Sequence, residues 1–177
     1  MDPQLSGWQN FYVIVGSSAG ALIGLQFVVI ALLSSTRTPA LTVAMRAFAT
    51  PTIVYFSSVL LTAGLLTIPH HTQTSLGIVL LAIGTIGLAY VARVAGHMRR
   101  QDNYSPDHGD WLWFMFLPAT AFAGDFVAGA TVWSVSGASL DIAGGSAMLL
   151  LLVGVHNAWD GAVWMVANPP ADRESES

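Results

Sequence analysis

The sequence predicts an all-α membrane protein, a bundle of five transmembrane helices with the N-terminus outside and the C-terminus in the cytoplasm. Three observations predict this fold: the composition, the uncharged runs and the positions of the arginines. Hydrophobic residues make up 54% of the chain and charged residues only 9%, whereas a soluble domain has about 25% charged residues. A bundle in lipid does not need a polar surface, because the bilayer is its solvent.

Long uncharged runs define the predicted helices. No charge occurs between Asp2 and Arg37, nor between Arg46 and Arg93, and about 20 apolar residues suffice to cross the hydrocarbon core. The second run is long enough for two helices, with a polar break that begins at Pro69. We expect one transmembrane domain over residues 1–177, with a flexible tail at 168–177. Its helices are predicted at about 11–33, 50–68, 75–95, 111–133 and 142–167.

Because of Pro51, the sequence allows two alternatives for the start of the second helix. Proline suits the first turn of a helix and disrupts the interior. Residues 41–49 therefore form either a short interfacial helix before a span that starts at Thr50, or the first part of one kinked helix.

The arginines decide between four and five spans. With five spans, all of the arginines fall on one side, which the positive-inside rule assigns to the cytoplasm; they are Arg37, Arg46, Arg93, Arg99, Arg100 and Arg173. With four spans they would fall on both sides. Tryptophans near the predicted edges agree with five spans, with Trp8 and Trp133 outside and Trp111, Trp113 and Trp164 inside.

Composition also excludes several classes of function. The chain has no cysteine, which rules out disulfides and thiolate metal sites. It has no basic patch, so we expect no nucleic-acid partner. We expect the protein to bind no cofactor and to be surrounded mainly by the lipid bilayer.

The first predicted helix carries a stripe of small residues at Gly16, Gly20 and Gly24, with Gln26 further along. Small residues four apart let two helix backbones approach closely. The stripe is interpreted either as a seam for self-association or a pore lining, or as packing within one chain. Gln26 is a candidate for a hydrogen bond between helices or chains.

Ionisable residues in the last two predicted helices are the strongest functional signal. His156 and Asp160 are four residues apart and share one helix face, with Asn157 beside them. Asp125 lies in the preceding helix, and we expect it at a depth similar to His156. Ionisable groups inside a membrane mark ion pathways and proton relays. Asp125, His156, Asp160 and Asn157 are therefore the predicted ion pathway or relay, and a structural hydrogen-bond cluster is the alternative.

Three other chemistries were weighed against this site. Gly124-Asp125-Phe126 resembles the active-site motif of GxGD intramembrane aspartyl proteases, and Trp159-Asp160 resembles its partner motif. However, Phe122 replaces the first glycine, the order of the two motifs is reversed, and there are too few helices. Haem binding needs two axial ligands at matched depth, and only His156 is placed deep. A metal site from His156, Asp160 and Asp125 would be a mixed nitrogen and oxygen site that lacks a fourth ligand.

Several segments resemble a group of small bacterial multi-pass membrane proteins with a Gly-rich first helix and a His-Asn-Ala-Trp-Asp last helix. The resemblance covers most of the chain and is carried by residues 11–28, 50–52, 111–113 with Pro118, and 155–160. It implies the bacterial inner membrane and brings no particular activity. The group favours histidine in the second helix where this chain has Tyr55.

Together these features predict an oligomeric channel or transporter-like protein that conducts ions, protons or a small solute. The alternative is a non-catalytic accessory protein of another membrane complex. We expect a homo-oligomer, and an enzymatic role is the least favoured.

Overall fold

The computed structural model describes residues 3–33, 39–69, 72–98, 108–134 and 136–167. Within them the chain is all-helical, without strands. The long helices are α1 (Pro3–Leu33), α2 (Pro39–Leu66), α3 (Gln73–Met98), α5 (Leu117–Thr131) and α6 (Ser136–Ala167). A short helix α4 (His108–Trp111) and a π-helical turn η2 (Leu112–Phe116) lead directly into α5. The predicted tail at 168–177 lies outside the described residues.

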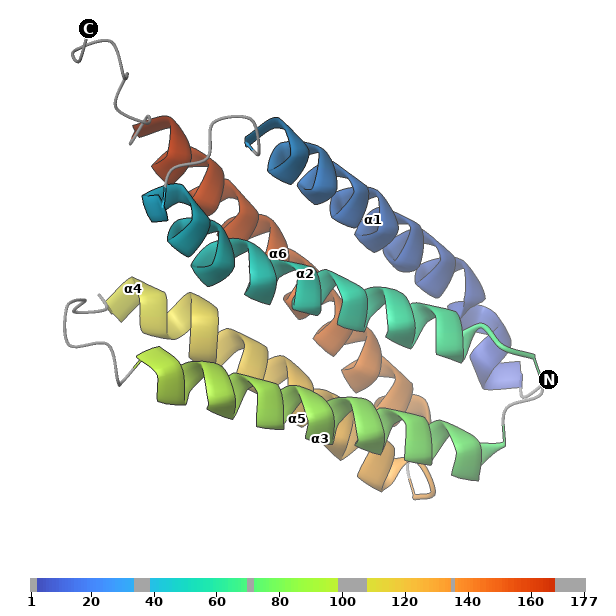
Figure 1. The fold of residues 1–177 in the computed structure, drawn as a ribbon. Coiled ribbons are helices and arrows are strands. Elements are labelled where there is room, and N and C mark those ends of the chain that lie inside the picture. The colour runs from blue at the N-terminus through green and yellow to red at the C-terminus, as the bar shows by residue number, and fades with distance from the viewer. Residues whose placement is uncertain (1–2, 34–38, 70–71, 99–107, 135, 168–177) are drawn as a thin grey trace, which may run out of the picture.

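Successive long helices run antiparallel, so the bundle has two ends (Figure 1). We call them the N-terminal end, where α1 and α6 begin, and the C-terminal end, where α6 ends. Four stretches are long and apolar enough to cross a membrane, namely Gly7–Leu32, Gln73–His97, Leu112–Thr131 and Gly137–Trp164. The apolar part of α2, Thr50–Leu66, is shorter.

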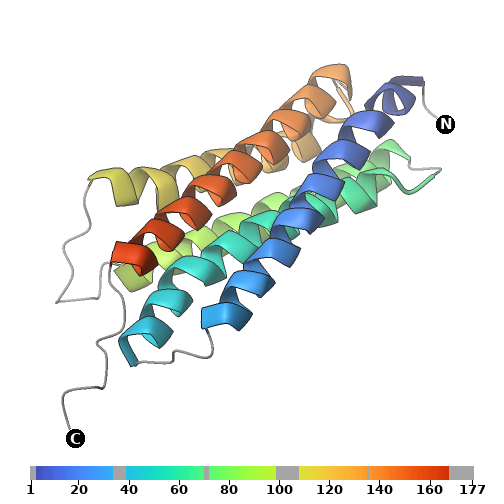
Figure 2. The ribbon, with the colours of Figure 1, turned by 90° about the horizontal axis from the view of Figure 1, so that it is seen from above.

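Helix α6 holds the bundle together. It packs against both α2 and α5, while α1 packs on α2 and α3 packs on α5. Figure 2 shows this arrangement along a second direction. The expectation that the last two long helices are antiparallel neighbours is confirmed, as the short connection between them predicts.

Of the two alternatives at Pro51, the structure has one uninterrupted α2 with this proline inside it. Pro51 has no N–H to donate to the carbonyl four residues earlier. At the start of α3, by contrast, Thr72 and Ser75 cap the helix reciprocally. The Ser75 amide donates to the Thr72 hydroxyl at 3.1 Å and the Thr72 amide to the Ser75 hydroxyl at 3.0 Å, which satisfies two amides at the helix start.

Glycines set how closely α3 and α5 approach. A Cβ atom on Gly84 of α3 would lie 2.5 Å from the backbone nitrogen of Phe126. A Cβ on Gly129 of α5 would lie 2.6 Å from the backbone nitrogen of Leu81. Each helix therefore presents a bare backbone to the other, as small residues do at interfaces between membrane helices.

Candidate functional site

Asp125 is the buried acidic side chain of the bundle. It lies on α5, is 1% exposed, and its Oδ1 atom has no hydrogen-bond partner among the described residues. Gly124 beside it lacks a side chain, and Ser146 Oγ of α6 fills the space where a Cβ would stand. Asp125 therefore lies at the level of Ser146, at the contact between α5 and α6.

Tyr12 of α1 is the polar neighbour of Asp125. The Tyr12 ring is 1% exposed and packs in the same cluster as Ala128 and Ala143. Ala128 lies one turn beyond Asp125 on the same face of α5, so Tyr12 is buried beside the part of α5 that carries Asp125. The Tyr12 hydroxyl oxygen also has no hydrogen-bond partner in the described part of the chain.

Two hydroxyl groups lie between Asp125 and the N-terminal end of the bundle. Thr131 Oγ1 of α5 and Ser139 Oγ of α6 are 3.0 Å apart, and Ser139 is fully buried. Thr131 also donates to the Val127 carbonyl at 2.8 Å. Between this pair and Asp125, the side chains of Ala128, Leu140 and Ala143 belong to a buried apolar cluster.

His156 and Asp160 form the predicted pair on α6. His156 Nε2 lies 3.0 Å from Asp160 Oδ2, and the two side chains are 32% and 46% exposed. The His156 ring stacks on the Trp113 ring, with a centroid distance of 3.6 Å and an interplanar angle of 22°. This pair is a half-exposed contact between an imidazole and a carboxylate, packed against an aromatic face. Trp113, predicted as an edge residue, packs against it.

The expectation that Asp125 and His156 share one depth is wrong. His156 lies beside Trp113 in η2, and Asp125 follows Trp113 by twelve residues. At a rise of 1.5 Å per residue this is about 18 Å along the helix axis. Asp125 instead lies level with Ser146 of α6. The bundle therefore holds two separate polar groups, one near each end.

Asn157 belongs to the group nearer the C-terminal end. Its side chain is 0% exposed, and neither amide atom has a hydrogen-bond partner among the residues that the structure describes. Gly154 packs against the ring of Phe56, which sets the register of α6 against α2. Because the helices are antiparallel, one further turn places Asn157 level with Thr52, which is also fully buried.

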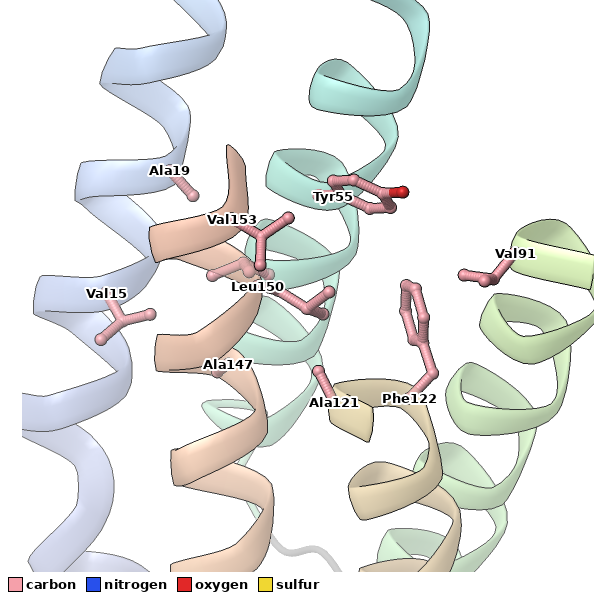
Figure 3. Close-up of a cluster of buried hydrophobic side chains, with 10 residues drawn as sticks. Val15, Ala19, Tyr55, Val91, Ala121, Phe122, Ala147, Leu150 and Val153 are labelled. Atoms are coloured by element: carbon pink, nitrogen blue, oxygen red, sulfur yellow. The ribbon is translucent and has the colours of Figure 1, made fainter. Parts of the chain in front are cut away.

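A cluster of apolar side chains separates the two polar groups (Figure 3). Phe122 of α5 lies one turn from Asp125 toward the C-terminal end, and Leu150 and Val153 of α6 lie between Ser146 and His156. All three are fully buried. We call the following residues the apolar layer: Val15, Ala19, Tyr55, Val59, Val91, Ala121, Phe122, Ala147, Leu150 and Val153.

Tyr55 has a role that sequence reasoning missed. Its hydroxyl donates to the Phe114 carbonyl at 3.3 Å. Pro118 follows Phe114 by four residues and has no N–H to donate to that carbonyl. In the same turn the Leu117 amide bonds the Leu112 carbonyl, five residues back. Pro118 was the available signal, because a proline inside an apolar run predicts a carbonyl that needs another donor.

The glycines of the α1 stripe differ in their surroundings from one end of the helix to the other. A Cβ on Gly16 would lie 2.9 Å from the Ala63 Cβ of α2, so this glycine packs inside the chain. Gly20 has only Leu60 at 4.0 Å, and Gly24 has nothing within 4 Å. Gln26 is half-buried. The described residues hold no group of three His, Asp or Glu side chains that could bind a metal ion.

Comparison with known proteins found no matching family model, no matching curated protein and no matching solved structure.

Proposed function

We propose that this protein is a multi-pass membrane transporter or channel that moves a proton, another ion or a small solute across the bacterial inner membrane. The proposal includes five spans. Four helices have the required length and apolar character. For the fifth, α2, support comes from its 28 residues, about 42 Å at 1.5 Å per residue, and from its place between α1 and α6.

The arginines support an orientation with the N-terminus outside. Arg46 lies in the first third of α2 and Arg93 in the last turns of α3. Both positions are at the C-terminal end of the bundle. The positive-inside rule assigns the end richer in arginine to the cytoplasm.

The transport function is supported mainly by the burial of the Asp125 carboxyl without a counter-charge among the described residues. Its described surroundings contain no ion pair, and an ionised carboxylate without a counter-charge is expensive inside a membrane. A protein that needed only stability would place an apolar residue there. Binding and releasing a positively charged species is the function that gives this carboxylate a use.

Self-association is the second part of the proposal. The half of α1 that follows Gly20 presents large apolar side chains to the outside of the bundle, among them Leu25, Phe27 and Leu32. Gly24 lies on the same half of α1, and nothing in the chain lies within 4 Å of the position where a Cβ would stand. Small residues beside large ones form the close contacts by which membrane helices associate, and we propose that two copies of the chain meet there.

The test is ion flux in liposomes that contain the purified full-length protein. We expect Asp125→Asn to abolish flux and Asp141→Asn to leave it unchanged, because Asp141 lies on the exposed face of α6. Both variants must elute from gel filtration as the native protein does. Equal flux in the native protein and Asp125→Asn would refute the role of Asp125. No flux from the native protein, together with a co-purified membrane partner, would favour an accessory protein instead.

A further inference from the structure

We infer that Asp125 and Tyr12 together bind one proton, so that the ion moved is a proton and not a metal cation. This inference rests on the proposed transport function and names its substrate. It starts from two buried oxygens without partners, one on α5 and one on α1.

The Tyr12 hydroxyl and the Asp125 carboxyl can share a proton through a hydrogen bond. A tyrosine hydroxyl both donates and accepts a hydrogen bond, and a protonated carboxyl does the same. Tyr12 can therefore donate to the carboxylate of Asp125 and accept from its protonated form, directly or through one water. A pair of this kind can serve Asp125 in both protonation states.

A divalent metal cation needs more ligands than these residues supply. Hard cations such as Ca²⁺ take six to eight oxygen ligands, and Mg²⁺ requires near-ideal octahedral geometry. Among the described residues no group of three His, Asp or Glu side chains could bind a metal ion. A proton needs only one carboxylate oxygen, and the experiment below distinguishes it from sodium and potassium.

The remaining ionisable groups do not compensate the charge of Asp125. On α6, Asp141 faces outward, and His156 with Asp160 lies at the other end of the bundle. Tyr55 on α2 lies in the apolar layer, where its hydroxyl is bonded to Phe114. Tyr90 packs its ring against Tyr55, and Arg93, one turn further along α3, is exposed.

The experiment uses full-length protein in liposomes loaded with a pH-sensitive dye, with a pH gradient across the membrane. We expect proton flux to persist when choline replaces all sodium and potassium. Asp125→Asn should abolish it, because an amide cannot carry the proton. Tyr12→Phe should slow it roughly tenfold, the effect of losing one hydrogen bond to a charged group. Tyr90→Phe is the matched control and should leave the rate unchanged.

The outcomes separate this inference from the proposed function. Flux of sodium or potassium that requires Asp125 would keep the transport function and overturn the proton assignment. Absence of any flux would overturn the transport function. An infrared spectrum gives an independent measurement: we expect a carboxylic acid band that is lost in Asp125→Asn, shifted in Tyr12→Phe and unchanged in Tyr90→Phe. A band unaffected by Tyr12→Phe would overturn the pairing of the two residues.

Discussion

The imidazole of His156 lies flat on the indole of Trp113, with 3.6 Å between ring centroids. The stack joins α6 to the π-helical turn η2 at the C-terminal end of the bundle. At the edge of the imidazole ring, His156 Nε2 lies 3.0 Å from Asp160 Oδ2. The histidine predicted as part of a buried relay is thus held between an aromatic face and a carboxylate, far from Asp125.

We expect the stack to stabilise the fold. In a double-mutant cycle with Trp113→Leu and His156→Leu, the coupling free energy should be about 0.5–1.5 kcal/mol, the range for aromatic pairs. The measurement is reversible unfolding in mixed detergent micelles. A cycle with Trp159→Leu in place of Trp113→Leu is the control, because Trp159 is 68% exposed. Strict additivity in the first cycle would contradict a stabilising stack.

Tyr55→Phe should destabilise the protein by about 0.5–1.5 kcal/mol, the usual contribution of one hydrogen bond. The lost donor is the hydroxyl that bonds the Phe114 carbonyl. Pro118→Ala would supply a backbone N–H four residues after Phe114. We therefore expect Tyr55→Phe to lower the free energy of unfolding by less in the Pro118→Ala background, measured by the same unfolding assay. An equal decrease in both backgrounds would show that the backbone N–H at position 118 does not replace the Tyr55 hydroxyl as a donor.

Gly84→Ala should destabilise the protein by about 1–3 kcal/mol, as overpacking does in a tight core. The new methyl group would meet the backbone of Phe126, which cannot move without separating α3 from α5. Gly96→Ala in the same helix is the control. It has nothing within 4 Å and should leave stability unchanged or raise it by up to about 1 kcal/mol, because alanine favours helix. A neutral Gly84→Ala would contradict the close approach of the two helices.

Gly24→Leu should weaken self-association while leaving the fold intact. Nothing within 4 Å opposes a side chain at Gly24, so a larger one obstructs only a neighbouring copy. Gly64→Leu on α2, a position equally open within the chain, is the matched control. Native mass spectrometry of the detergent-solubilised protein measures the oligomeric state. An unchanged oligomer in Gly24→Leu would place the seam elsewhere or show that none exists.

The candidate site was predictable in its residue types and not in its arrangement. Asp125, His156 and Asn157 stand out in an otherwise apolar chain, because polar side chains are rare in apolar helices of this length. Which of them are neighbours depends on how far each helix slides and turns against the next. Gly124, Gly154 and the glycines of α3 decide this through contacts with helices distant in the sequence. Tyr12, which we propose as the partner of Asp125, is not marked by any local sequence pattern.

The sequence by itself determined that the chain forms long apolar helices and roughly where each lies. This information is local, because the length of an apolar run and the polar residues at its ends are enough to define a helix. Only the tertiary structure decided that Tyr12 is buried beside the part of α5 that carries Asp125, that His156 stacks on Trp113 nearer the C-terminal end, and that the apolar layer lies between them. The reason is that the register of helices is set by packing between side chains far apart in the chain, which no local pattern encodes.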